Sequence, residues 1–177
     1  MDEGINSFYE LRYTNQRFSE QNYLSSFYNI NKKNSAAFGL ERLSYNRFYQ
    51  LIYLFTARHN NDQTVSLPAE KFTPVNYAAD LYTKASLCFS YLRNYLGDSL
   101  FDAAMQQYFV EWKFKHPHPA DIKSVFSSVT QKDLSWFFDG MISSTIKIDF
   151  EVSKVQKDQG SYQMRITDKG NSFAPYS

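Results

Sequence analysis

The spacing of apolar residues changes once along this chain, and that change sets the fold class. As far as about Ile142 the apolar residues recur every three or four positions, which is the period of an α-helix with one buried face. After Thr145 they alternate with polar residues, as in a half-buried β-strand. The sequence therefore predicts a mainly α-helical chain, a helical bundle, that ends in a short β-hairpin.

The helical part divides into six segments separated by turn residues. We expect helices over about 2–17, 38–57, 77–96, 98–112, 119–129 and 134–141. Gly97 is a natural left-handed stop between two of them, and Pro119 suits the first turn of another. Short connections favour antiparallel neighbours in a bundle.

Two of these helices carry apolar stripes whose position can be tested. The first stripe consists of Ile5, Phe8, Tyr9 and Tyr13. The second, in the segment 38–57, consists of Leu40, Leu43, Phe48, Leu51, Leu54 and Phe55. Between them lies a polar, Asn-rich stretch, 28–37, that we expect to be a loop.

A β-hairpin is the simplest interpretation of the last thirty or so residues. The first strand should carry Ile146, Ile148, Phe150 and Val152, and the second strand Tyr162, Met164 and Ile166. Together these residues should form one apolar face of the hairpin. The turn should fall at 158–160. A lone hairpin is marginally stable in water. We therefore expect a helical part, 1–143, followed by a part, 144–177, that begins a truncated β domain.

Charge and composition argue against several classes of partner. The net charge is +1 and no basic block occurs, which disfavours nucleic acid. The longest apolar runs are too short to span a bilayer, so we expect no transmembrane segment in this chain. The single cysteine, Cys88, lies in an apolar stretch and should be a buried small hydrophobe.

Two further features are compatible with function without specifying it. Residues 58–77 are polar and contain Pro68 and Pro74, which predicts a long ordered loop of the kind that often carries function. His116 and His118 flank Pro117 and would be close enough to touch a metal, but no H-E-x-x-H and no cysteine pair accompanies them. The alternative, that His118 stands at a helix start, is the more common situation.

Three blocks in order resemble one family of peptidases. "MDEGINSFYE" is similar to W-L-N-E-G-F-A-T-Y-x-E, and "VNYAADLYTKASLCFSYLRNYLGDSLFDAAMQQYF" to P-Y-E-K-G-A-x-x-L-x-x-L-x-x-x-L-G-D-x-x-F. "PADIKSVFSSVTQKDLSWFFDGMI" resembles the block that ends in G-x-D-L-x-x-F-F-x-x-W-L. These are blocks of the gluzincin zinc aminopeptidases, the thermolysin-like peptidase family M1 typified by membrane alanyl aminopeptidase. The departures are mild: Asp2 stands for Asn, Leu81 for Pro and Ala85 for Gly.

The resemblance implies a function and assigns roles to two residues. In the family zinc is held by the two histidines of H-E-x-x-H and by the Glu that falls here on Glu3. The catalytic tyrosine, which donates to the oxyanion, falls on Tyr82. The parent enzyme would then release N-terminal residues from peptide substrates. Lys84, the lysine of Y-x-K, is either a solvated cation, which we favour, or a partner for an acid near the site.

The same resemblance implies that the chain begins at the third zinc ligand. H-E-x-x-H and the G-x-M-E-N strand would lie upstream of Met1, so residues 1–143 would be the helical half of the catalytic domain. Such a fragment should be inactive alone and should retain little zinc. The alternative is a non-catalytic helical module whose aromatic cleft binds peptide or carbohydrate. No motif can be placed in residues 14–74.

Overall fold

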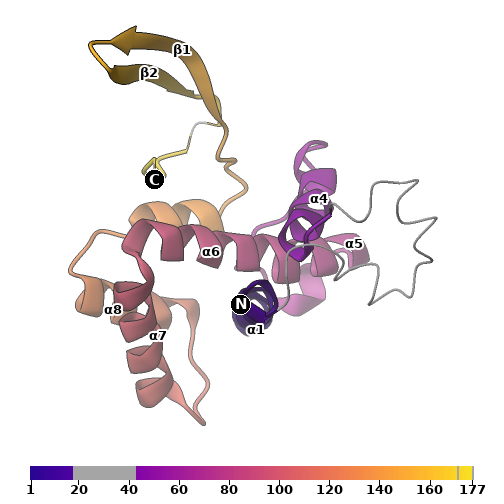
Figure 1. Ribbon diagram of the computed structural model, residues 1–177. Coiled ribbons are helices and arrows are strands. Elements are labelled where there is room, and N and C mark those ends of the chain that lie inside the picture. Colours follow the sequence, from indigo (N-terminus) through magenta and orange to yellow (C-terminus); the bar gives the residue numbers. More distant parts are fainter. Residues whose placement is uncertain (18–42, 171, 177) are drawn as a thin grey trace. The chain divides into compact units, whose positions relative to one another are not determined.

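The computed structural model describes residues 1–17, 43–170 and 172–176 (Figure 1). These residues are mainly helical and end in a two-stranded antiparallel hairpin, which confirms the predicted fold class. The chain forms two compact units, Met1–Asp98 and Ser99–Ser177. The loop expected at 28–37 and the first five residues of the helix expected at 38–57 lie outside the described residues.

A continuous helical rod is the centre of the first unit. It consists of α5 (Pro74–Asn76), η3 (Tyr77–Lys84) and α6 (Ala85–Leu96). The rod begins where the Thr73 hydroxyl accepts a hydrogen bond from the Asn76 amide, at 3.3 Å. It ends, as expected, at Gly97, whose φ of 78° suits glycine. The middle segment, η3, is π-helical rather than α-helical.

Helix α1 (Asp2–Arg17) crosses this rod and contacts both η3 and α6 (Figure 1). The crossing is unusually close at Gly4, where an added Cβ would lie 2.2 Å from Cβ of Ala85 and 3.0 Å from the Leu81 carbonyl oxygen. The buried residues of α1 are Gly4, Ser7, Phe8, Leu11 and Thr14.

The prediction of which residues of α1 face the interior was therefore only partly right. Phe8 is buried, but Tyr9 is 40% exposed and Tyr13 is 60% exposed. The small residues Gly4 and Ser7 permit the close crossing, so their side of the helix faces the rod instead of the tyrosine side.

Helix α4 (Tyr45–Ala57) packs against η3 and departs further from its expected stripe. Ser44 caps its first turn by accepting a hydrogen bond from the Arg47 amide. Its buried residues are Tyr49, Thr56 and Ala57. The apolar residues expected to face the interior, Leu51, Leu54 and Phe55, are 53%, 40% and 69% exposed.

The second unit contains three helices whose aromatic residues meet. They are α7 (Asp98–Trp112), α8 (Pro119–Thr130) and η4 (Trp136–Ile142), the last again π-helical. The ring centroids of Phe101 and Phe126 lie 5.7 Å apart, and those of Phe126 and Phe138 lie 6.1 Å apart. Each of these rings is buried, so one residue from each helix forms this small core.

The hairpin follows the helices of the second unit. Strand β1 (Phe150–Asp158) pairs with β2 (Ser161–Asp168), and a two-residue turn joins them. Gln159 and Gly160 both have positive φ, at 40° and 90°, as a tight hairpin turn requires. The turn lies where the sequence predicted it, but β1 begins at Phe150, so Ile146 and Ile148 precede the strand.

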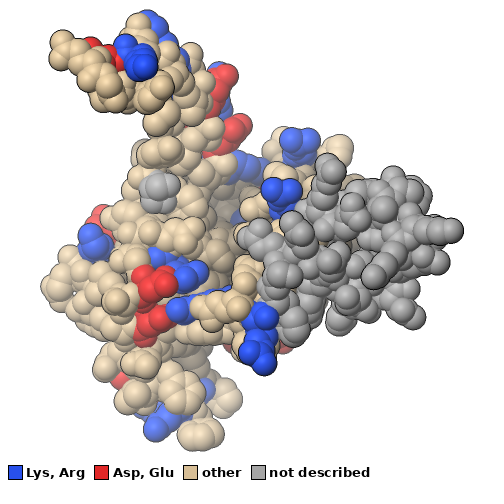
Figure 2. Space-filling view, in the orientation of Figure 1, with Lys and Arg blue, Asp and Glu red and all other residues tan. Residues whose placement is uncertain are grey.

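The surface carries charges of both signs. Lysine and arginine side chains occur together with acidic ones on the face drawn in Figure 2, which agrees with a net charge of +1. Among the described residues, no helix combines the length and the apolar character that crossing a membrane would require.

We predict that Gly4→Ala destabilises the chain. The new methyl group would overlap Ala85, and forcing a methyl into such a packed contact typically costs about 1–3 kcal/mol. Gly140→Ala is the matched control, because nothing lies within 4 Å of a Cβ there and alanine is a better helix former by about 1 kcal/mol. Urea denaturation followed by circular dichroism measures both, and equal stabilities would refute the close crossing.

Candidate functional site

The π-helical segment η3 carries the residues that matter most for this site. Single-turn π insertions in helices are frequent at functional sites because they change which side chains face a neighbour. Here the segment contains Asp80, Tyr82 and Lys84. The sequence predicted a helix over these residues but gave no signal for its π character.

Lys84 is buried, which overturns the expectation that it is a solvated cation. The residue is 2% exposed, and its Nζ lies 3.3 Å from a carboxylate oxygen of Asp62. The same ammonium donates a hydrogen bond to the Gln63 carbonyl oxygen, at 3.1 Å. A buried charge is tolerated only when it is paired in this way. The polar loop that follows α4 supplies both partners, and the sequence offered no means of pairing them with Lys84.

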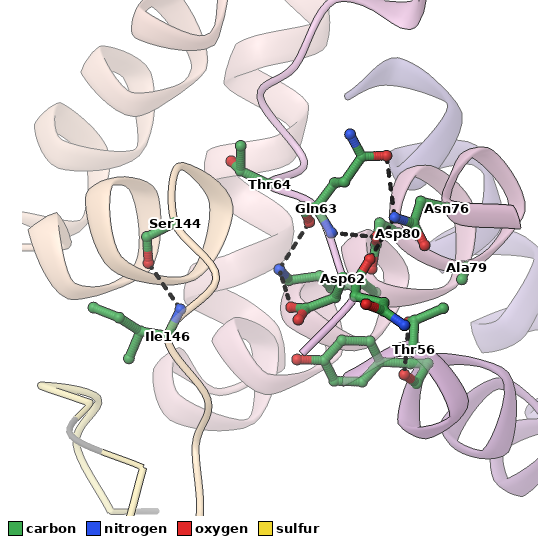
Figure 3. Close-up of polar contacts among 12 residues, drawn as sticks. Thr56, Asp62, Gln63, Thr64, Asn76, Ala79, Asp80, Ser144 and Ile146 are labelled. Carbon is green, nitrogen blue, oxygen red and sulfur yellow. Dashed lines mark hydrogen bonds and ion pairs between the residues drawn. The ribbon is translucent and has the colours of Figure 1, made fainter. Parts of the chain in front are cut away.

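The acid of η3, Asp80, is held by the same loop. Asp80 is fully buried, and its carboxylate accepts a hydrogen bond of 2.6 Å from the Gln63 amide. The Gln63 side chain in turn accepts hydrogen bonds from the Asn76 side chain and from the Thr73 amide. Figure 3 shows Gln63 joined by hydrogen bonds to both Asn76 and Asp80. The long loop expected from the sequence is thus ordered, and it ties the π segment in place.

A cavity of about 550 Å³ opens between α1, α4 and η3. All three elements belong to the first unit. The wall includes the acidic and aromatic residues Glu3, Glu10, Tyr45, Phe48, Tyr49 and Tyr82. The wall combines carboxylates with aromatic rings, and its volume is in the range of small-molecule and peptide subsites.

The cavity brings together the two residues that the resemblance singled out. Glu3 lies in the first turn of α1 and Tyr82 in η3, and both line the cavity. Gly4 is the next residue after Glu3, and Ala85 lies three residues after Tyr82. The close crossing of Gly4 over Ala85 is therefore what places Glu3 and Tyr82 on one wall.

The surroundings of Tyr82 favour its protonated form. Desolvation of this half-buried phenol, a hydrogen bond with Tyr77 and the negative charge of Glu3 raise the pKa of Tyr82, in that order. The rings of Tyr77 and Tyr82 are in contact, with centroids 5.6 Å apart. A phenol of ordinary pKa, about 10, is already protonated at neutral pH, and these surroundings keep Tyr82 in that form, so it can act as a hydrogen-bond donor in the cavity.

Sequence reasoning missed a second polar group on the same wall. The Tyr45 hydroxyl donates to a Glu10 carboxylate oxygen at 3.0 Å, and the hydroxyls of Tyr45 and Tyr49 lie 3.2 Å apart. Burial, followed by Tyr49 and then Glu10, raises the pKa of Tyr45. Tyr45 and Tyr49 stand four residues apart on α4, and Glu10 stands seven residues after Glu3 on α1. These helical spacings are the only signal in the sequence that could have found them.

Other candidate residues have structural roles. His118 precedes the first residue of α8, and its amide donates to Asp121 at 2.6 Å, so it stands at a helix start as expected. Cys88 is buried, also as expected, and burial raises the pKa of its thiol to about 12. No three histidine, cysteine or acidic side chains of the described residues come close enough together to hold a metal ion.

One of three comparisons with known proteins gave a match. Residues 1–141 match the family described as "Peptidase family M1 domain". No curated protein and no solved structure gave a significant match. The matched region includes the described helices of both units as far as Met141 and every described residue of the cavity wall.

We predict that Lys84→Met is strongly destabilising. It removes the ammonium that neutralises the buried Asp62, and breaking a buried ion pair in this way typically costs about 3–5 kcal/mol. Lys123→Met is the matched control, since Lys123 pairs with Asp139 at 2.7 Å on the surface, where such pairs contribute about 1 kcal/mol or less. Denaturant midpoints compare the two variants, and similar losses of stability would show that the buried pair does not hold η3.

Proposed function

Because the chain belongs to peptidase family M1, we propose that it forms one wall of a zinc aminopeptidase active site, with Glu3 as a zinc ligand and Tyr82 as a catalytic donor. The observation that supports this most directly is that both residues line one cavity, where the charge of Glu3 acts on the Tyr82 phenol. A carboxylate and a protonated phenol at one site are what metal-assisted hydrolysis of an amide requires from this side.

Glu3 suits a metal ligand in chemistry and in placement. Its carboxylate is half-buried at the start of α1 and faces a cavity that a peptide can enter. Catalytic zinc sites use three protein ligands and leave a position for water, and carboxylate oxygen is one of the usual ligand types. The resemblance implies two histidines as the other ligands, and we propose that they come from an H-E-x-x-H segment outside these 177 residues. When bound, zinc would polarise the scissile carbonyl and activate the water.

Tyr82 suits the role of oxyanion donor. Its phenol makes a hydrogen bond with Tyr77, and the raised pKa means that its surroundings favour the protonated form. As an amide carbonyl is attacked, negative charge develops on its oxygen. A donor that is fixed before the reaction stabilises that charge without any cost of reorganisation. The buried polar contacts of Asp80 and Lys84 fix η3 on either side of Tyr82.

The domain division follows from the same proposal. Residues 1–143 would form the helical part of the catalytic domain, and 144–177 would begin a β-sandwich domain. The last helix of the matched region, η4, ends at Ile142, and β1 begins at Phe150. The exposed apolar residues of the hairpin, such as Val155, Tyr162 and Met164, would pack against the further strands of that domain.

A second candidate function is a non-catalytic helical module that binds peptide or carbohydrate in the aromatic cleft. It is favoured by the rings of Tyr45, Phe48, Tyr49 and Tyr82 in the cavity wall. The two functions differ in what they require. Binding alone needs neither zinc nor the Tyr82 hydroxyl, whereas hydrolysis needs both.

We predict that Tyr82→Phe lowers the kcat of the zinc enzyme that contains this chain by about 10²–10³-fold, the usual loss for one oxyanion donor. KM should change far less, because the hydrogen bond is made mainly in the transition state. Zinc content should not change, because the phenol is not a ligand in this proposal. Turnover of an amino-acid anilide, together with metal analysis, measures all three quantities.

Tyr95→Phe provides the control for this experiment. It deletes a hydroxyl from the same rod at a position that does not line the cavity. Its kcat should equal that of the wild type. If Tyr82→Phe also retained full kcat with zinc bound, Tyr82 would be a packing residue and the binding module would be the better description.

The 177-residue chain by itself should bind zinc only weakly and should not hydrolyse anilides. In this proposal it supplies one of the three ligands. Metal analysis after dialysis tests the first expectation. Stoichiometric zinc that survives dialysis, and that His116→Ala with His118→Ala removes, would place the metal at the histidines instead of Glu3.

A further inference from the structure

The cavity between α1, α4 and η3 has two ends with different chemistry. Glu3 and Tyr82 lie at one end, and Glu10 with Tyr45 and Tyr49 lies at the other. Glu10 follows Glu3 by seven residues on α1, which corresponds to two helical turns and about 10 Å along the helix axis. The proposed function uses the Glu3 end and leaves the Glu10 end without a role.

The hydrogen bonds at the Glu10 end have one possible direction. A phenol carries a single proton, and that of Tyr45 is donated to Glu10. The Tyr45 oxygen must therefore accept the contact at 3.2 Å, so Tyr49 donates to Tyr45. Neither proton is then available to a ligand. What this end offers a ligand is the carboxylate of Glu10 and the faces and oxygen atoms of aromatic side chains.

The described residues of the cavity wall are negative in character. Among them none is lysine, arginine or histidine, while Glu3 and Glu10 are both acidic. Aromatic rings attract cations through their faces, and carboxylates do so by charge-assisted hydrogen bonds. A wall of this composition favours a cation and disfavours an anion.

We propose that the Glu10 end of the cavity binds the ammonium or guanidinium group of a basic peptide side chain. Glu10, oriented by Tyr45 and Tyr49, accepts the hydrogen bonds of the cation, and the neighbouring rings, including Phe48, contact its methylene groups. A span of about 10 Å equals roughly three residues of extended peptide. If the proposed function is right, the basic residue therefore lies within about three residues of the bond held near Glu3.

Binding of two blocked tripeptides to the 177-residue chain tests this proposal. The probes are acetyl-Ala-Lys-Ala-amide and its norleucine analogue, which has the same apolar stem without the charge. Blocked ends leave the side chain as the only cation. We expect the lysine peptide to bind about tenfold more tightly, a difference of about 1.4 kcal/mol, in titrations followed by NMR or calorimetry. The preference should weaken as salt is added, because Glu10 is exposed.

Glu10→Gln should abolish most of the tenfold preference for the lysine peptide and should leave the affinity for the norleucine peptide unchanged. Glu70→Gln is the matched control, because it removes the same charge from an exposed residue of η2 (Ala69–Lys71) that does not line the cavity. Thermal midpoints of both variants confirm that each is folded. Tyr45→Phe should reduce the preference by a smaller factor, since Glu10 keeps its charge and loses only its orienting donor.

Three results would overturn the proposal. They are equal affinity of the chain for the two peptides, a loss of the lysine preference in Glu70→Gln as large as that in Glu10→Gln, and no saturable binding of the lysine peptide. The titration contains no zinc and measures no turnover. A failure here therefore leaves the outcome for Tyr82 in the zinc enzyme unaffected, and a failure of the catalytic role of Tyr82 leaves the lysine preference standing.

Discussion

The close crossing of α1 over the central rod is the contact on which the candidate site depends. Gly4 lies so near Ala85 that any side chain at position 4 would force the two helices apart. Glu3 precedes that contact on one helix and Tyr82 lies one turn before it on the other. Their shared cavity therefore follows from the absence of a Cβ at one position. The departure from the family pattern at Ala85, where glycine is usual, is accommodated because the partner residue is itself glycine.

Packing against α1 is one constraint on Tyr82, which lies in a π-helical segment, a rare form of helix. The polar loop after α4 supplies the second constraint. Asp62 and Gln63 bind Lys84 and Asp80, which stand two residues after and two residues before Tyr82. Buried polar networks of this kind are costly unless every member is satisfied, so they define one arrangement sharply. α1 and the loop thus hold the same eight-residue segment, one by close contact and the other by buried hydrogen bonds and charge.

The sequence predicted those features that depend on local signals. Helical periodicity predicted the bounds of α1. Gly97 marked the end of the rod, and the turn residues at 158–160 marked the hairpin turn. It failed where a distant partner decides the outcome. Lys84 can be buried because its ammonium pairs with Asp62 at 3.3 Å, and Asp62 is 22 positions away in the sequence. The stripe of α4 was wrong because Leu51 and Phe55 have the right period and yet are exposed, so periodicity does not tell which face a neighbour covers. The resemblance assigned roles to Glu3 and Tyr82, which the structure places in the wall of one cavity, and those roles stay predictions.

The two glutamates of α1 have different tyrosine neighbours. Both face the same cavity from the same side of the helix. Glu10 is engaged by the Tyr45 hydroxyl at 3.0 Å, and a carboxylate that is held by a phenol donor is oriented for hydrogen bonding. Glu3 instead exerts its charge on Tyr82, a phenol whose raised pKa keeps its proton. In the proposed function Glu3 is the metal ligand because it lies in the same cavity wall as Tyr82, the proposed oxyanion donor. Under the two proposals together, one helix face would present a metal ligand and a cation acceptor two turns apart, each with a different tyrosine beside it.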